Sequence, residues 1–111
     1  MMYILDENRN LVPCKDSATW AKWVENSENR KVAQDRVGDY FVSTVFLGLD
    51  HNFGPVGEPR CFETMVFKGG SSSEKFCNRY CSWDEALAGH EKVMEALSLA
   101  LNSPDGEAKY E

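Results

Sequence analysis

The segment from Tyr40 to Asp50 constrains the fold most strongly, because the strand that it predicts is apolar on both faces. Successive side chains of a strand point to opposite faces of a sheet. A strand with two largely apolar faces needs cover on both, so we expect it to be a central strand. One face consists of Phe41, Ser43, Val45, Leu47 and Leu49, and the other of Tyr40, Val42, Thr44 and Phe46.

Further strands are expected on both sides of this segment. Residues 32–37 predict its hairpin partner, with Gly38 and Asp39 at the turn. Residues 61–67 and 76–81 predict two more strands, which are rich in aromatic and β-branched residues. Together these segments indicate an antiparallel sheet.

The N-terminal region predicts a smaller hairpin followed by a helix. Residues 3–5 and 11–13 are short apolar segments around a polar turn. Asp16 or Ser17 is suited to cap a helix over residues 17–28. The apolar face of that helix consists of Trp20, Trp23 and Val24, which we expect to pack in the core.

A longer helix is expected over residues 83–102. Ser82 and Glu85 form a capping-box pattern at its start, and Pro104 follows its end. Apolar residues at helical spacing predict one buried stripe along it. The stripe comprises Trp83, Leu87, His90, Val93, Met94, Leu97, Ala100 and Leu101.

The order of these elements predicts an α+β domain over residues 1–103, with an antiparallel sheet of about four to six strands packed by two helices. We expect residues 104–111 to form a loose acidic tail. The sequence has no apolar run long enough for a transmembrane helix and no secretory pattern at its start, so we expect a cytoplasmic location and no membrane partner.

Charge is concentrated at the C-terminal end of the chain. The net charge is −6, and residues 82–111 hold seven acidic residues against two lysines. A protein that binds nucleic acid directly needs a basic patch to neutralise phosphates, and this composition argues against one. An acidic helix face would instead attract a basic partner.

The four cysteines are Cys14, Cys61, Cys77 and Cys81. They contain no Cys-x-x-Cys pair, so the spacing does not favour a zinc site. We expect all four to be reduced, buried thiols that act as small apolar residues. No motif indicates a cofactor.

Several segments are similar to a family of small bacteriophage and prophage proteins. They are residues 43–54, which include LGLDHNFG, the FETMVF segment at 62–67, residues 80–90 and the opening at 3–6. The resemblance implies a phage accessory protein that acts in the cytoplasm of a bacterial host. It implies binding to a host factor, such as a restriction or CRISPR defence complex, and no catalytic role carries over from it.

The two histidines and their acidic neighbours are the candidates for chemistry. A metal site would have to join His51, Glu63 and His90. Symmetric pairing about the loop would place Asp50 opposite Arg60 and Glu63 about 13 Å along the strand from His51, opposite Leu47. The simpler hypothesis is an Asp50–Arg60 pair and a hydrogen bond from His51 that anchors the loop.

Two of these residues have alternative interpretations. Glu63 is either a buried carboxylate paired with Arg36, Arg60 or Arg79, or a polar spot on a binding surface. His90 lies on the apolar stripe of the last helix, where we expect a core histidine that hydrogen-bonds a residue of the sheet.

The uneven charge together with the resemblance leads us to expect a binding protein that docks on a host protein, for example in the nucleic-acid groove of a defence effector. An alternative is a small metal-dependent hydrolase that uses His51, Glu63 and His90. Another is a homo-oligomeric structural protein with an exposed apolar sheet face, and the oligomeric state is left open. The predicted partner-binding residues are Asp50, His51, Asn52, Phe53, Arg60, Glu63, Glu91 and Glu95.

Overall fold

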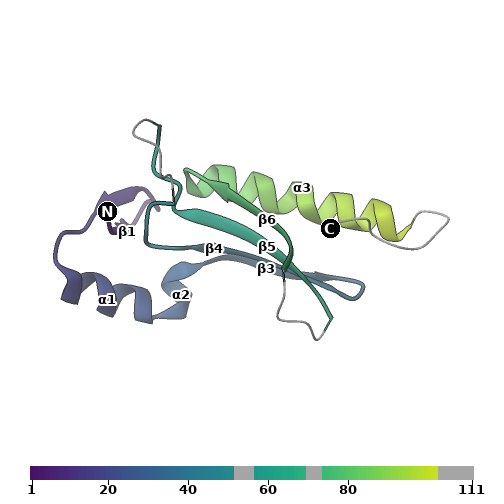
Figure 1. Cartoon of the computed structure of the whole chain (residues 1–111), viewed down its shortest axis with the longest axis horizontal. Helices are drawn as coiled ribbons and strands as arrows, with labels where there is room; N and C mark the ends of the chain where they lie inside the picture. Colours follow the sequence, from purple (N-terminus) through teal and green to yellow (C-terminus); the bar gives the residue numbers. More distant parts are fainter. Residues whose placement is uncertain (52–56, 70–73, 103–111) are drawn as a thin grey trace.

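Four strands form an antiparallel sheet in sequence order (Figure 1). The computed structural model describes residues 1–51, 57–69 and 74–102. β4 and β5 are the inner strands, so the predicted central strand is confirmed, and with it the α+β fold. The strands are β3 (Lys31–Val37), β4 (Tyr40–Phe46), β5 (Phe62–Lys68) and β6 (Glu74–Tyr80).

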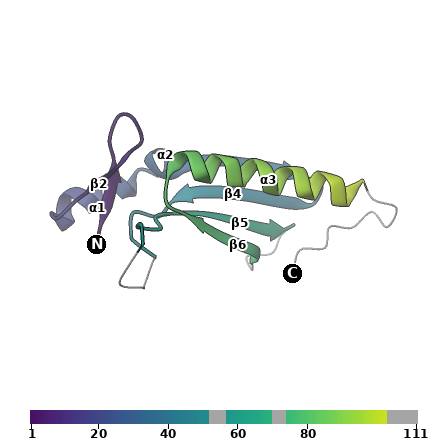
Figure 2. The ribbon, with the colours of Figure 1, turned by 90° about the horizontal axis from the view of Figure 1, so that it is seen from above.

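One face of this sheet is covered by the long helix α3 (Trp83–Leu101), which runs along the strands (Figure 2). β4 alternates between buried and half-buried residues, and its buried side chains face α3. The register places buried residues of β5 directly beside them. The buried residues at this interface include Val42, Phe46, Phe62 and Val66 from the sheet and Ala86, His90, Val93 and Leu97 from the helix.

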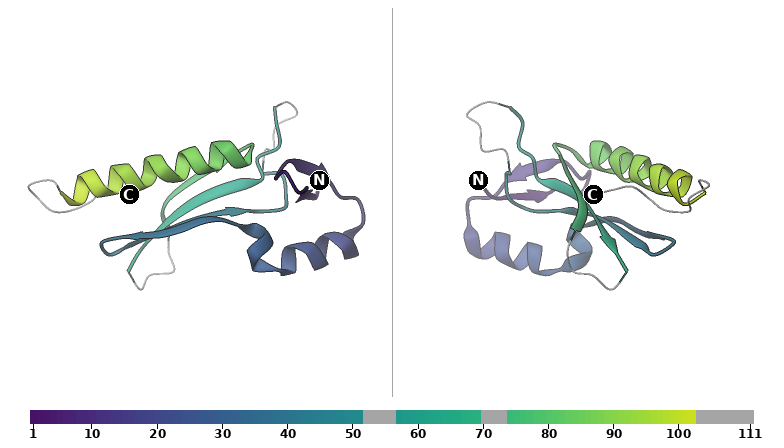
Figure 3. Two further views of the ribbon diagram at one scale, coloured as in Figure 1. Left: turned by 180° about the vertical axis from the view of Figure 1, so that it is seen from behind. Right: turned by 45° about the vertical axis from the view of Figure 1, so that its right-hand side comes forward.

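The opposite face of the sheet carries half-buried apolar side chains. The register pairs Phe41 with Phe67 and Ser43 with Met65 on this face, and Val45 lies beside them. The short helices α1 (Ser17–Glu25) and α2 (Ser27–Arg30) lie beside one end of the sheet rather than across this face (Figures 1 and 3). We call this surface the open sheet face.

The helix predicted over residues 17–28 is wrong in one respect, because it is broken at Asn26. This residue has an extended backbone, ends α1 and caps α2, whose Glu28 amide donates to its side chain. Asp16 caps α1 as predicted. The Thr19 hydroxyl and the Ala18 amide hold the pKa of Asp16 below its usual value.

The N-terminal elements pack on one end of the sheet. β1 (Tyr3–Leu5) and β2 (Leu11–Pro13) form a two-stranded sheet of their own. The rings of Trp23 and Phe46 pack edge to face, with their centroids 5.5 Å apart. The centroids of Phe46 and Phe62 are 5.2 Å apart. The expectation that Trp20, Trp23 and Val24 pack in the core is met only in part, because all three are half-buried and Trp23 packs against the edge of the core. Trp23 thereby joins the two parts of the molecule.

The predicted strand over residues 40–50 is too long, because β4 ends at Phe46 and the chain turns at Gly48. Gly48 has a φ of +78°, a conformation that favours glycine. Its carbonyl accepts a 3.0 Å hydrogen bond from the Trp20 indole and a 2.8 Å bond from the Tyr3 amide. An added Cβ would lie 3.1 Å from Trp20 and from Val24. The turn thus anchors both α1 and β1.

α3 begins with the predicted cap. The Ser82 hydroxyl accepts from the Glu85 amide at 3.1 Å, and the Glu85 carboxylate accepts from the Cys81 amide at 3.0 Å. The reciprocal bond thus reaches Cys81, one residue before the N-cap position of a standard capping box. Among the described residues, none of the helices has the length and apolarity needed to cross a lipid bilayer. The predicted tail, residues 104–111, lies outside the described residues.

Replacing Gly89 with alanine tests how closely α3 packs on β6. An added Cβ would contact the ring and the hydroxyl of Tyr80, so the helix or the ring must shift. We expect the free energy of unfolding to fall by about 1–2 kcal/mol, because the strain exceeds alanine's better helix propensity. Urea unfolding measures it, with Ser98→Ala on the exposed side of α3 as control. A Gly89→Ala variant as stable as the wild type contradicts this packing.

Candidate functional site

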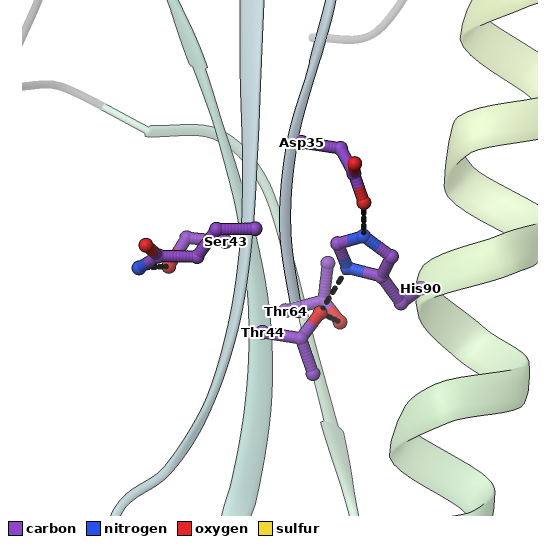
Figure 4. Close-up of polar contacts among 6 residues, drawn as sticks. Asp35, Ser43, Thr44, Thr64 and His90 are labelled. Atoms are coloured by element: carbon purple, nitrogen blue, oxygen red, sulfur yellow. Dashed lines mark hydrogen bonds and ion pairs between the residues drawn. The ribbon is translucent and has the colours of Figure 1, made fainter. Parts of the chain in front are cut away.

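The most concentrated group of polar side chains lies between α3 and the sheet (Figure 4). His90 on α3 is fully buried, and its Nε2 lies 2.8 Å from Oδ2 of Asp35 on β3. Its Nδ1 lies 2.7 Å from the Thr44 hydroxyl on β4. The Thr44 hydroxyl lies 2.6 Å from that of Thr64 on β5. One histidine thus connects the helix with three strands.

The donors and acceptors of these four residues can be assigned along the series of hydrogen bonds. A carboxylate only accepts, so the Nε2–H of His90 donates to Asp35. In the neutral ring, Nδ1 then accepts from the Thr44 hydroxyl, whose oxygen accepts from Thr64. Among the described residues, no buried side-chain nitrogen or oxygen lacks a partner. The expectation that His90 is a core histidine bonded to the sheet is confirmed.

The order carboxylate, imidazole, hydroxyl is also that of a hydrolytic triad. Here the hydroxyl is inaccessible, because Thr44 and Thr64 are both 0% exposed. Only Asp35 reaches the surface, with a side chain that is 52% exposed. A substrate could therefore meet the carboxylate but not the hydroxyl, and the arrangement is suited to positioning α3 rather than to nucleophilic attack.

Glu63 lies on the other side of the sheet and is held by Arg79. Its side chain is 7% exposed and accepts a 2.9 Å bond from the Arg79 Nε, and the Cys77 thiol lies 3.4 Å away. Of the three arginines expected as partners, Arg79 is the one that the structure shows. The predicted register was wrong by two residues, because Glu63 pairs with Val45 and not with Leu47.

The proposed metal ligands do not come together. Glu63 lies on the open sheet face and His90 on the face that α3 covers, so the sheet separates them. His51 lies at the base of the loop, where its amide donates to the Arg60 carbonyl at 3.0 Å. Within residues 1–51, 57–69 and 74–102, no three His, Cys, Asp or Glu side chains are grouped as metal ligands.

Asp50 and Arg60 meet at the base of the loop, although the register of β4 and β5 does not make them opposite residues as predicted. The Asp50 carboxylate accepts a 2.9 Å bond from the Arg60 amide, so this contact uses the backbone of Arg60. His51 donates its own amide to the Arg60 carbonyl, as noted above. The predicted partner-binding residues Asn52 and Phe53 lie outside the described residues.

Among the cavities on the described surface are two large ones, and neither is lined by His90. One of about 540 Å³ lies between the β1–β2 turn and the start of α3, where the Arg9 guanidinium stands 4.4 Å from the Trp83 ring. The other, of about 560 Å³, lies between β6 and α3 and is lined by Tyr80 and Val93 among others. Cys81 is the one cysteine among the described residues that line the first cavity.

The cysteines differ from the prediction in exposure. Cys14 and Cys61 are buried as expected, but Cys77 is exposed and Cys81 is half-buried. Burial, and then the Glu85 and Glu58 carboxylates, raise the pKa of the Cys81 thiol. A raised pKa leaves little thiolate at neutral pH, so Cys81 is a weak nucleophile there.

The outer side of α3 carries the charge that the sequence places there. Glu91 and Glu95 are exposed, one helical turn apart, and Asp84 lies exposed on the first turn. Lys92 is the one basic residue of the helix. We call Asp84, Glu91 and Glu95 the acidic face of α3.

Sequence reasoning found His90 but missed its partners Asp35, Thr44 and Thr64. A weak signal exists, because Asp35 and Thr44 interrupt apolar positions on the covered faces of their strands. Which polar residues meet the histidine depends on the register between strands and on where α3 crosses them, and neither follows from local sequence.

Thr44→Val should show that this chain of hydrogen bonds is structural. The change keeps the shape but leaves the His90 Nδ1 and the Thr64 hydroxyl without a partner, at a cost of about 1–3 kcal/mol. Urea unfolding measures the loss. The control is Ser43→Ala on the open sheet face, where the lost bond to Gln34 is exposed. Equal losses in the two variants contradict the assignment.

Comparison with known proteins assigns no family. No protein-family model matches the chain. No curated protein and no solved structure matches it either. The function is therefore inferred from the geometry described above.

Proposed function

We propose that the protein is a non-enzymatic binding protein that docks on a partner protein through the acidic face of α3. The observation that carries this proposal is the exposure of Glu91 and Glu95 on a helix whose other side is fixed to the sheet. Both side chains therefore project from fixed positions on the helix backbone, which places their charges on one surface for electrostatic recognition.

The alternatives for catalysis have less support. The hydrogen bonds that link Asp35, His90, Thr44 and Thr64 offer no accessible hydroxyl, because both threonines are buried. The Glu63 carboxylate is bonded to Arg79. For the same reason we leave Glu63 out of the docking surface. The base of the loop, with Asp50, His51 and Arg60, lies at the end of the molecule where α3 starts, because the Cys81 thiol contacts the Glu58 carbonyl at 3.7 Å. It extends the docking surface.

The chemistry of this surface points to a partner with a basic surface. Carboxylates on a rigid helix complement lysine and arginine side chains and speed the encounter with them. The resemblance to phage proteins is the ground for seeking that partner among proteins of a bacterial host. A nucleic-acid-binding effector of a defence system, such as a CRISPR complex, has the basic groove that this proposal needs.

Charge reversal on α3 tests the docking surface. We expect Glu91→Lys with Glu95→Lys to abolish capture of a partner from a bacterial lysate, and high salt to weaken the wild-type complex. The control is Glu25→Lys with Glu28→Lys on α1 and α2, which makes the same change in net charge away from α3. Circular dichroism checks that each variant is folded. The proposal is contradicted if the α3 variant still captures the partner, or if both variants lose the partner equally.

Self-association is a second candidate function, favoured by the open sheet face. Phe41, Val45, Met65 and Phe67 are half-buried there, and α3 covers only the other side of the sheet. Apolar side chains on an uncovered sheet are typical of surfaces that pack against another chain. This function would make the protein a homo-oligomer with a structural role.

Light scattering over a range of concentrations tests this candidate. We expect the mass to rise from that of the monomer towards that of a dimer as concentration increases, and Met65→Lys to keep the protein monomeric. The control is Leu99→Lys, because Leu99 is 66% exposed on α3 and lies away from the open sheet face. A constant monomer mass removes this candidate, as does equal loss of association in both variants.

A further inference from the structure

The strand register brings two cysteines together at the end of the sheet. The last pair between β5 and β6 is Phe62 with Tyr80. The next residue outward is Cys61 on one strand and Cys81 on the other. Continued pairing therefore places these two cysteines opposite each other, with their side chains on the same side of the sheet.

The hydrogen bonds show which kind of pair this is. The Arg79 amide donates to the Asn78 side chain and the Cys81 amide donates to Glu85, so both amides point away from β5. Residues at these positions form non-hydrogen-bonded pairs, whose Cα atoms are about 4.5 Å apart. That separation falls within the range of about 4.4–6.8 Å that a disulfide spans.

The surroundings of the two thiols agree with this placement. Burial first, and then the Asp50 carboxylate and Cys81, raise the pKa of Cys61 to about 12. Asp50 is also among the groups that raise the pKa of Cys81. The two thiols thus share a charged neighbour. Cys61 is fully buried, whereas Cys81 lines the cavity at the start of α3 and is the one that a small reagent reaches.

We propose that Cys61 and Cys81 form a reversible cross-strand disulfide by exchange with a small-molecule disulfide such as oxidised glutathione. This inference is independent of the proposed function. In the first step the Cys81 thiolate attacks one sulfur of the reagent, a mixed disulfide forms and one thiolate leaves. In the second step the Cys61 thiolate attacks the Cys81 sulfur and the second thiolate leaves. The two cysteines lose two electrons, and the reagent is reduced to two thiols once the leaving groups take up the protons.

The other two cysteines provide internal controls. Cys77 is exposed, stands opposite Met65 in the register and contacts the Glu63 carboxylate. Cys14 is buried and its thiol donates to the Asp16 carbonyl. Neither is paired with a cysteine in the strand register. Cys77 should therefore form a stable mixed disulfide with the reagent, since no neighbouring thiol displaces it.

The bond would connect two segments that meet at this end of the fold. Cys61 follows Arg60, whose amide and carbonyl close the base of the loop. Cys81 precedes Ser82, the cap of α3. Oxidation would tie the loop base to the helix start and should raise the melting temperature, because the crosslink restricts the unfolded chain.

Mass spectrometry of the full-length protein tests the proposal. The protein is incubated with mixtures of reduced and oxidised glutathione, quenched in acid, alkylated and mapped without reduction. We expect a peptide that joins Cys61 to Cys81, and one glutathione on Cys77. The rate of bridging should rise roughly tenfold from pH 7 to pH 8, because the thiolate fraction grows in that proportion below a raised pKa.

Two variants make the result decisive. Cys81→Ser should eliminate the bridge, whereas Cys77→Ser should keep the bridge and lose the adduct. Circular dichroism confirms that both are folded, and Cys81 is changed rather than Cys61 because Cys61 lies in the core. A glutathione that remains on Cys81 without resolution overturns the proposal. A bridge that involves Cys14 or Cys77 overturns it too, as does a Cys81 that stays reduced after Cys77 has reacted.

Discussion

The burial of an imidazole in an otherwise apolar interface is the constraint on which the arrangement of sheet and helix depends. His90 sits in the middle of the buried side of α3, where an unpaired polar group would be costly. Its two nitrogens are hydrogen-bonded only when α3 is placed so that Nε2 meets Asp35 and Nδ1 meets Thr44. Apolar packing alone would tolerate a helix that slides along the sheet. The directional bonds select one position, and the remaining contacts of α3 then follow.

The N-terminal elements are held by a second set of directional contacts at the end of the sheet. The turn at Gly48 offers its carbonyl to both Trp20 and Tyr3, and the ring of Trp23 closes over Phe46. These residues are far apart in sequence, so the small hairpin and α1 gain stability from the sheet rather than from local propensity. The same end of the fold gathers the loop base, the cap of α3 and both cysteines of the proposed disulfide.

The groups outside these contacts are the basis of the proposed function. Of the candidates for chemistry that the structure describes, His90 is buried and Glu63 is paired with Arg79. The exposed features are instead a rigid acidic helix and an open sheet face with half-buried apolar residues. Both are features of surfaces that contact other proteins, and they lie on opposite sides of the sheet. The proposed binding role rests on these two surfaces.

Local sequence determined the elements. The apolar faces of residues 40–46 required a central strand, and the Ser82 cap started α3 where the structure has it. The break at Asn26 is also local, because the Asn26 side chain caps α2 by accepting from the Glu28 amide. The end of β4 at Phe46 and the partners of His90 were instead decided by tertiary structure. Helix and strand periodicity depend on residues a few positions apart, so the chain itself specifies them. Register, turns shaped by distant side chains and the pairing of buried polar groups depend on residues that only folding brings together.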